Sequence, residues 1–408
     1  MSGAVTAADS QWSVLGLQVP GSVDRPVWSL AISPAHPAIM LQATQGRGVL
    51  RSSDSGATWS PVLTADSAAW VVHFDPQQPT VVYAGTPTQG LWRSADEGKS
   101  WVRAGQGLDP DVRAIDVAPG LVLAGTAHGV YYSTDAAASW HSLGLATLAI
   151  AAVAVIQDGS TTTLFAGADN GTAGGYLQTS TGLSGAWSIV HGNFPADATL
   201  ATIAVGPAPS GSTGHSIFAG TSQGLYRSDD TGASWNPVAG LPQADVNAVS
   251  INPWSGDQIY VGSDGDQGQG GVFRSLDHGS TWTPLAGTGF PHRPRVTALA
   301  LQPGPALLVL ADTWNPTTNE IGLYRIPDTA AATSASSNPV TSPTARATAL
   351  PTPQPRTASS QAHGTGGFEL PVAARTLGIG AAVAIVLVLA LVVRRWRMRR
   401  QDLQTYRR

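Results

Sequence analysis

The 408-residue chain contains no cysteine, a single lysine (Lys99) and only three glutamates, Glu97, Glu320 and Glu369. The absence of cysteine excludes a disulfide framework, a cysteine nucleophile and a cysteine-ligated zinc or iron–sulfur site. The nine histidines show no metal-ligand spacing such as His-x-x-x-His. The sequence therefore indicates neither a metal site nor a cofactor.

Charge is also scarce, at 12% of the residues, and it is unevenly placed. Residues 1–370 carry 14 basic and 25 acidic side chains, whereas residues 394–408 carry seven arginines and one aspartate. An acidic body with a short basic end argues against nucleic-acid binding by the body. The basic segment needs its own explanation.

That explanation is a hydrophobic run directly before it. The 18 residues from Thr376 to Val393 carry no charge, and as a helix they would extend about 27 Å, close to the hydrocarbon thickness of a bilayer. We expect a transmembrane helix over residues 371–393, with the arginine-rich tail 394–408 in the cytoplasm and the body outside the cell.

The beginning of the chain has neither a basic nor an apolar leader segment. Either the start of translation lies upstream, or the body stays inside and the chain is tail-anchored. The positive-inside rule favours the first alternative.

A linker separates the body from the hydrophobic run. Within residues 329–367, 28 of 39 residues are Thr, Ala, Ser or Pro, a composition that cannot bury a core. We expect residues 328–370 to be a disordered stalk and residues 1–11 a disordered N-terminus.

The body between them is a repeat. Four segments have the complete pattern Ser-x-Asp-x-Gly-x-(Ser/Thr)-Trp, and further copies end at Trp140, where Ala137 replaces the glycine, and at Trp187, where the aspartate is lost. The aspartates of the recognisable copies are Asp54, Asp96, Asp135, Asp230 and Asp277. The period of 39 to 48 residues between successive tryptophans is that of a four-stranded propeller blade.

The pattern is typical of a tight hairpin. The aspartate accepts backbone N–H groups of its own turn, the glycine supplies a positive φ, and the tryptophan covers the turn. Ala137 at the glycine position should therefore cost about 1 kcal/mol.

These motifs resemble the Asp box, or bacterial neuraminidase repeat, of sialidases, xyloglucanases, the sortilin ectodomain and photosystem II assembly factors. The resemblance covers residues 12–327 and implies an all-β, seven-bladed propeller with structural aspartates. The seventh repeat has three strands before the stalk, and Trp12-Ser-Val-Leu-Gly16 matches the outer strand that it lacks. We therefore expect the N-terminal strand to complete the last blade and close the ring.

Catalysis has weak support. Tyr324-Arg325-Ile326-Pro327 looks like the sialidase Arg-Ile-Pro signature, but it lies at the end of the last repeat, and the three glutamates do not supply that family's Tyr–Glu pair. Ser263-Asp264-Gly-Asp266 begins like a calcium loop but lacks the later ligands. A hydrolase could still use two loop aspartates, among them Asp111, Asp169, Asp264, Asp266 and Asp312.

A binding site is better supported. The second residues of the seven inner strands should surround the central opening on one face; they are Trp28, Trp70, Arg113, Ala151, Ala201, Asn247 and Thr297. Arg25, Arg295 and Trp314 belong to neighbouring loops of that face. Two indoles and a guanidinium suit a sugar or a peptide, although both tryptophans could instead pack between blades. We expect non-catalytic binding or scaffolding of a protein or glycan; the alternatives are a carbohydrate-active hydrolase and an assembly factor for a membrane complex.

Overall fold

The computed structural model describes residues 11–15, 26–168, 177–190, 193–195, 198–207, 214–264, 270–285, 287–292, 294–304, 306–314 and 321–329. All of them belong to the first of two units of the chain, Met1–Val340. The expected stalk beyond residue 329, the expected transmembrane helix and the basic tail lie outside these residues, as do residues 1–10. Within the described ranges, no helix has the length and hydrophobicity needed to span a membrane.

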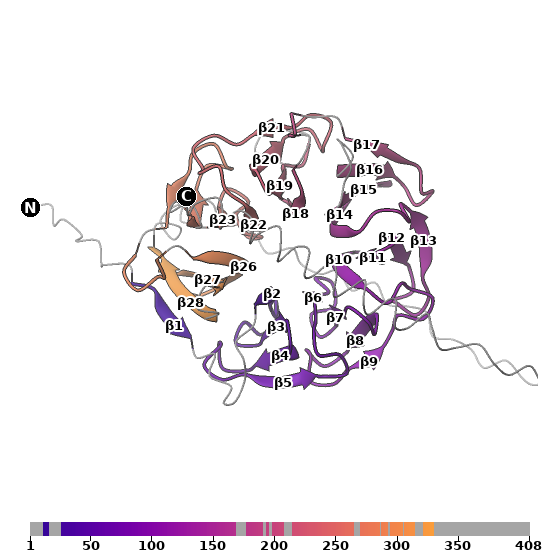
Figure 1. Ribbon diagram of the computed structural model, residues 1–408, viewed down its shortest axis with the longest axis horizontal. Helices are drawn as coiled ribbons and strands as arrows, with labels where there is room; N and C mark the ends of the chain where they lie inside the picture. The colour runs from indigo at the N-terminus through magenta and orange to yellow at the C-terminus, as the bar shows by residue number, and fades with distance from the viewer. Residues whose placement is uncertain are drawn as a thin grey trace, which may run out of the picture. The chain divides into compact units, whose positions relative to one another are not determined.

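Among the described residues, every strand belongs to one of seven four-stranded antiparallel sheets, which form the blades of a propeller around a common centre (Figure 1). The innermost strands of blades 1 to 7 are β2 (Val27–Ile32), β6 (Val71–Phe74), β10 (Val112–Ala118), β14 (Ile150–Asp158), β18 (Leu200–Val205), β22 (Val246–Ile251) and β26 (Arg295–Gln302). Each inner strand contacts the inner strands of both neighbouring blades, so the seven sheets form a ring.

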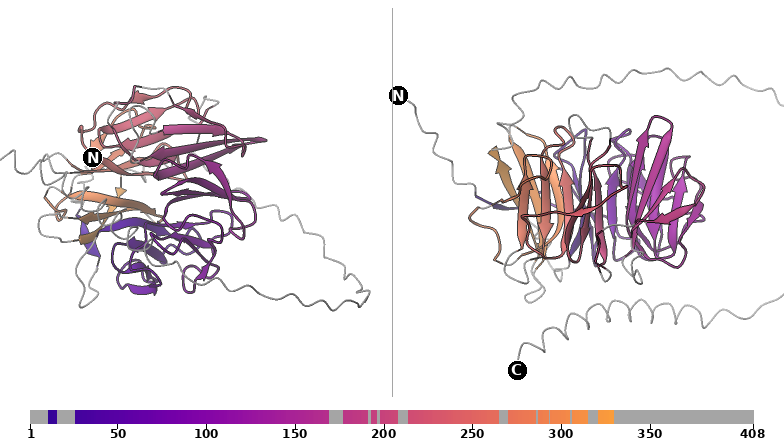
Figure 2. Two further views of the ribbon diagram at one scale, coloured as in Figure 1. Left: turned by 45° about the vertical axis from the view of Figure 1, so that its right-hand side comes forward. Right: turned by 90° about the horizontal axis from the view of Figure 1, so that it is seen from above.

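The remaining strands follow in sequence order from the centre outwards in blades 1 to 6, whereas the outer strand of blade 7 is β1 (Figures 1 and 2). The second strands are β3 (Met40–Thr44), β7 (Val82–Gly85), β11 (Leu121–Thr126), β15 (Thr161–Ala168), β19 (Ile217–Thr221), β23 (Ile259–Ser263) and β27 (Leu307–Trp314). The third strands are β4 (Gly48–Ser52), β8 (Leu91–Ser94), β12 (Gly129–Ser133), β16 (Leu177–Thr181), β20 (Gly224–Ser228), β24 (Gly271–Ser275) and β28 (Ile321–Asp328). The outer strands are β5 (Ser60–Leu63), β9 (Val102–Arg103), β13 (His141–Gly144), β17 (Trp187–Ile189), β21 (Asn236–Pro237), β25 (Thr283–Pro284) and β1 (Ser13–Leu15).

The N-terminal strand closes the ring, as the repeat count predicts. β1 is the outer strand of blade 7, where Ser13 pairs with Arg325 and Leu15 with Leu323. Trp12 N donates to Thr288 O at 2.8 Å, which attaches the strand to the loop between blades 6 and 7. Gln11, expected to be disordered, forms an isolated bridge to the same residue. The strand covers an edge that would otherwise be open.

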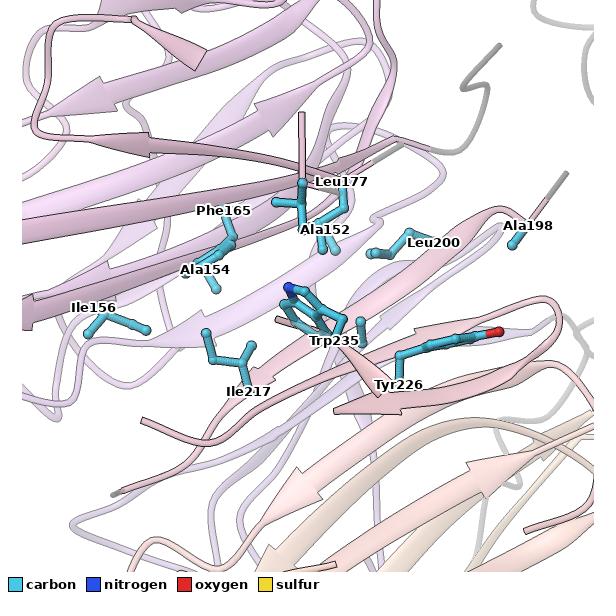
Figure 3. Packing of buried hydrophobic residues seen from close by; sticks show 12 residues of the cluster. Ala152, Ala154, Ile156, Phe165, Leu177, Ala198, Leu200, Ile217, Tyr226 and Trp235 are labelled. Carbon is cyan, nitrogen blue, oxygen red and sulfur yellow. The ribbon is translucent and has the colours of Figure 1, made fainter. Parts of the chain in front are cut away.

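The hydrophobic core consists of seven clusters, one between each pair of neighbouring blades. Figure 3 shows the cluster between blades 4 and 5, with Trp235 in the middle of the labelled side chains. The second strands lie between two such clusters, and most of them are buried along their whole length. Because both of their faces are covered, these strands lack the polar–apolar alternation of a half-exposed strand.

A glycine in five of the second strands allows the next blade to approach closely. A Cβ on any of them would lie 2.3–2.7 Å from one of the first residues of the next blade's inner strand. These glycines are Gly85, Gly125, Gly167, Gly220 and Gly262. These five glycines, four of which follow an alanine, therefore set the spacing between blades.

Candidate functional site

The blade order gives the propeller two different faces. Because the strands alternate in direction, each inner strand begins on the face that carries the loops after the second and fourth strands; we call this the mouth face. The loops after the first and third strands lie on the opposite face, which we call the turn face. The Ser-x-Asp turns follow the third strands and therefore belong to the turn face.

A β-bulge opens the inner strands at the mouth face. In six blades the pairing with the second strand skips one residue, always the second of the inner strand or its equivalent: Trp28, Arg113, Ala151, Ala201, Asn247 and Thr297. Each skipped residue is at least partly exposed, whereas the residue before it is buried. Blade 2 has the same arrangement at Trp70. Its N–H donates to Gly85 O, although Gly85 is already paired with Val71, so Trp70 is the extra residue of the bulge. Bulges of this kind re-aim a side chain next to a site.

Blades 1 to 3 bring an aromatic and ionic cluster together. The ring centroids of Trp28 and Trp70 are 6.0 Å apart, with an interplanar angle of 58°. Trp70 Nε1 donates to Asp111 Oδ1 at 2.8 Å, and Arg113 binds Asp111 Oδ2 through Nε at 3.1 Å and Nη2 at 2.9 Å. Asp111 thereby fixes both Trp70 and Arg113. Trp28 Nε1 has no hydrogen-bond acceptor in the described structure.

A second group lies at blades 6 and 7. Arg295 Nε is 3.1 Å from Asp264 Oδ2, and its guanidinium carbon lies 5.8 Å from the ring centroid of Trp314. Asn247 Nδ2 donates to Val296 O at 3.3 Å, which links the inner strands of these two blades. Arg25, also expected at this face, lies outside the described residues. The other six expected ligand-binding residues are on the mouth face, in two groups.

The structure adds a pair that sequence reasoning did not single out. His73 and Asp116, on the inner strands of blades 2 and 3, bring Nε2 and Oδ1 to 3.7 Å. Asp116 Oδ2 also accepts from Val155 N of blade 4 at 2.8 Å. Burial raises the pKa of Asp116, and the charge of His73 opposes that shift. An aspartate inside the apolar strand Val112–Ala118 was the signal that could have revealed it.

The turn face carries the Ser-x-Asp turns in the geometry that the motif predicts. Asp54 accepts the Thr58 hydroxyl at 2.6 Å, the Thr58 N–H at 2.9 Å and the Ser52 hydroxyl at 2.7 Å. These bonds, the Thr58 hydroxyl first, lower the pKa of Asp54 to about 2. The equivalent bonds recur at Asp96, Asp135, Asp230 and Asp277.

Positive φ angles extend over two residues of each recognisable turn. Gly56 has φ 86°, and the residue before it, Ser55, has φ 59°. Ala137 adopts the position of the missing glycine with φ 70° and is buried. The expectation that alanine is held in a glycine conformation is confirmed; the positive φ of the preceding residue was not foreseen.

The indole N–H groups separate complete turns from incomplete ones. Where the motif is complete, the indole donates to the carbonyl of its own glycine at 3.0–3.2 Å, as at Trp59, Trp101, Trp235 and Trp282. Trp140 and Trp187 instead donate to Ala104 O and Leu143 O of the preceding blade, at 2.8 and 2.7 Å. Trp12 makes the corresponding contact with Leu285 O at 3.4 Å. An incomplete turn thus shifts its tryptophan into an interblade bond.

Polar contacts also join neighbouring blades at the turn face. Glu97 of blade 2 is buried and accepts from Ser33 Oγ at 2.7 Å, and it lies 2.9 Å from His36 Nδ1 of blade 1. Asp328, at the end of β28, occupies the position of the motif aspartate in blade 7. It accepts from the hydroxyl of Tyr260 at 2.8 Å and pairs with Arg274, both of blade 6. The last repeat, expected to lack this turn, therefore keeps its aspartate in an interblade contact.

The catalytic alternatives gain little from the geometry. Asp111 and Asp264 each pair with an arginine, and Asp312 is buried against Gln42 Nε2 at 3.1 Å. The backbone of Arg325 pairs with Ser13 in the closing strand. Over the described ranges, no group of three or more His, Asp or Glu side chains could hold a metal ion. Asp169 and Asp266 lie outside those ranges.

No family model and no curated protein sequence matches this chain. Solved structures do. The GH74 xyloglucanase of Xanthomonas campestris is 17% identical with a TM-score of 0.56, and the match covers 77% of this chain and 55% of that one. YCF48 bound to D1 peptide is 15% identical with a TM-score of 0.54, covering 80% and 99%. U3-55K is 11% identical with a TM-score of 0.57, covering 78% and 98%.

These matches establish the seven-bladed propeller fold. The chain spans about half the length of the two GH74 enzymes that it matches. At such low identity the likeness carries no activity with it.

Proposed function

We propose that this chain is a non-catalytic, membrane-anchored propeller of the Asp-box type that binds an extended segment of a partner protein at its mouth face. The observation that carries the proposal is the bulge at the start of the inner strands. It takes one residue of each inner strand out of regular pairing at the mouth face, and on three successive blades these partly exposed residues are Trp28, Trp70 and Arg113. Aromatic and arginine side chains are the residues most enriched in binding hot spots.

Two observations favour binding over glycoside hydrolysis. Hydrolysis needs two carboxyl groups on either side of one bond, whereas Asp111 and Asp264 are each neutralised by an arginine. The structural neighbours include a xyloglucanase, and another of them, YCF48, was solved with a peptide bound. That neighbour supports a peptide, rather than a glycan, as the ligand class.

Binding at the mouth is tested by a double substitution with a matched control. Trp70→Ala together with Arg113→Ala should abolish binding to peptides selected from a random display library, with the melting temperature within a few degrees. Trp254→Ala is the control, because this tryptophan is 51% exposed in the loop between β22 and β23 of the turn face. A sharp fall in melting temperature for the double variant would assign the pair to interblade packing. Hydrolysis of xyloglucan by the unaltered chain would refute the non-catalytic role.

The proposed anchor is the uncharged segment 376–393 with the arginines that follow it. Protease added to intact cells should release the propeller by cutting within residues 329–367 and leave the tail protected. Cleavage only after lysis would place the body inside the cell and contradict this orientation.

A further inference from the structure

The interface between blades 7 and 1, which we call the seam, departs from the repeat at two positions. In blades 2 to 6 the second-strand residue that pairs with the third residue of the inner strand, or its equivalent, is a glycine. In blade 7 the same register pairs Ala298 with Asp312. The position before the glycine is apolar in blades 2 to 7 but is Gln42 in blade 1; the apolar residues are Ala84, Ala124, Ala166, Ala219, Val261 and Ala311.

The two exceptional residues meet across the seam. Gln42 Nε2 lies 3.1 Å from both carboxyl oxygens of Asp312, from which it is separated by 270 positions of the chain. Asp312 is 1% exposed and Gln42 0%. Their direct strand neighbours, Leu323 and Leu30, belong to the hydrophobic cluster between these two blades. An acid and an amide therefore form a polar contact inside an apolar interface.

This contact is completed by a proton. Oε1 of Gln42 is buried and accepts no hydrogen bond within the described residues, and an ionised carboxylate has no hydrogen to donate to it. A protonated Asp312 has one. After a small rotation of the amide, one carboxyl oxygen accepts from Nε2 and the O–H of the other donates to Oε1. Ionisation leaves both a buried charge and an unpaired acceptor, which is unfavourable on both counts.

Few charged groups lie in the strands around the pair. β2 and β3 contain no titratable residue, and Arg47 lies in the turn after β3. β26 contributes Arg295, which is paired with Asp264 of blade 6. Burial is the main influence and raises the pKa of Asp312 to about 8, and the bond from Gln42 opposes it in part.

The third strand of blade 7 contributes three titratable residues. Tyr324 packs against the cluster between blades 6 and 7, and Asp328 pairs with Arg274 of blade 6. Arg325 lies two residues along β28 from Leu323, the direct neighbour of Asp312, in the direction of the turn face. None of the three is among the groups that shift the pKa of Asp312.

Other carboxyl groups between blades are compensated in place. Asp116 accepts from Val117 N and Val155 N and lies near His73. Glu97 and Asp328 each have two side-chain partners in the neighbouring blade. Within the described residues, the carboxyl of Asp312 has Gln42 as its one hydrogen-bond partner. The seam is therefore the interface that depends most on a proton.

We infer that the contact between Gln42 and Asp312 is a proton-dependent latch, and that the ring opens first at the seam when the latch loses its proton. The seam borders the blade that combines the two ends of the repeat: β1 joins β26 to β28 there, whereas the strands of every other described blade are consecutive (Figure 1). This conformational property belongs to the fold and is separate from binding at the mouth face.

The size of the effect follows from proton linkage. Opening exposes the carboxyl to water, where its pKa returns to an ordinary value near 4. Below that pH both forms carry the proton, and opening does not depend on pH. Between about 4 and about 8 the closed seam alone keeps the proton, so the open population rises about tenfold for each pH unit. Above about 8 both forms are ionised, and the population becomes constant.

The test uses the full chain, in which a single introduced cysteine is the one thiol. Ala300→Cys places it at the seam, and Ala154→Cys places it at the equivalent buried position between blades 4 and 5. Both variants are labelled with a maleimide from pH 6 to pH 8, and the ratio of the two rates cancels the intrinsic reactivity of the thiol. The ratio should rise about hundredfold over this range. It should become constant when Asp312→Asn is added.

Three results would overturn the inference. A ratio that is independent of pH would refute the latch, and a rise that persists in Asp312→Asn would assign the pH effect to another group. Equal acceleration at both positions would mean that the ring does not open first at the seam. The double variant Gln42→Ala with Asp312→Gly restores the residue types of the other blades and should also give a constant ratio.

A second measurement needs no substitution and decides the question if Ala300→Cys does not fold. Amide hydrogen exchange of the unaltered chain is followed at pH 6 and pH 8 and corrected for intrinsic exchange rates. β3 and β27, which flank the seam, should lose protection by a larger factor than β15 and β19 do. The same change in both pairs of strands would contradict opening at the seam.

Discussion

The turn face and the mouth face are built from the same repeats, yet residue types recur from blade to blade at the turn face and differ from blade to blade at the mouth face. At the turn face the same residue types recur from blade to blade: Ser, Asp, Gly, a second hydroxyl residue and Trp. At the mouth face the equivalent bulged positions hold Trp, Arg, Ala, Asn or Thr. Repetition marks the positions that every blade needs for its own stability. Divergence at equivalent, partly exposed positions marks those that stability leaves unconstrained, where a binding site can develop.

Polar contacts join neighbouring blades at both faces. At the turn face, Glu97, Asp328 and Gln302 each reach into a neighbouring blade, so loss of one side chain weakens a joint between sheets. At the mouth face, Asp111 of blade 3 accepts from Trp70 of blade 2, and Asn247 of blade 6 donates to Val296 of blade 7. Binding and stability therefore have to be measured together for each substitution.

The largest effect is expected from Asp328→Ala. The carboxylate of Asp328 is fully buried, and its removal leaves Arg274 and the Tyr260 hydroxyl without their shared acceptor. Loss of one partner of a buried pair should lower the free energy of unfolding by about 3–5 kcal/mol. Urea denaturation measures it. The control is Asp229→Ala, whose pairing with Arg227 is more exposed and should contribute about 1 kcal/mol or less. Equal losses of unfolding free energy in the two variants would mean that the buried interblade pair stabilises the fold no more than the exposed pair does.

Next in size is a pH effect at Asp312, which lies in β27 near the mouth. Burial raises the pKa of Asp312 to about 8, against an ordinary value near 4, and Gln42 offsets only part of this. Between these two pH values the folded chain keeps a proton that the unfolded chain has lost, so stability falls as the pH rises from about 4 to about 8. Asp312→Asn should melt close to the parent at pH 4 and several degrees higher at pH 8. A constant difference across this range would rule out titration of the carboxyl.

A moderate effect is expected from Asp230→Ala in a complete turn. The substitution removes the acceptor of Ser234 N and of two hydroxyl groups, which should cost about 1–2 kcal/mol. Peptide binding at the mouth should be unchanged, in contrast to the Trp70 and Arg113 double variant. A stable Asp230→Ala protein that has lost binding would reverse the roles of the two faces.

The smallest effect is expected from Ala137→Gly. Glycine relieves the positive φ of 70°, worth about 1 kcal/mol, but removes a buried methyl of similar value. The two terms should nearly cancel, leaving stability within about 0.5 kcal/mol by chemical denaturation. Gly232→Ala is the contrasting variant, because its Cβ would lie 2.5 Å from Phe165 of the preceding blade. Gly232→Ala should lower the free energy of unfolding clearly. An unchanged free energy of unfolding would show that the turn can move away from Phe165 without cost.

The sequence by itself determined the architecture. Trp59, Trp101 and the later tryptophans set the period, Asp54 and its equivalents set the turns, and Trp12 indicated the closing strand. These features depend on local chemistry, such as an aspartate that accepts its own turn's N–H groups, and local chemistry is written in short segments of the chain. The second position of the inner strands could also be found, because a repeated alignment reveals it.

Only the tertiary structure decided which of these residues meet. Asp111 and Trp70 are 41 positions apart and belong to different blades, and Asp328 reaches Tyr260 across 68 positions. A local sequence pattern cannot predict such contacts, because the partner of each residue depends on where the ring places the next blade. The bulge, too, was invisible in one strand, since it exists only as a mismatch between two paired strands. Ring closure is what places the equivalent positions of seven blades around one centre.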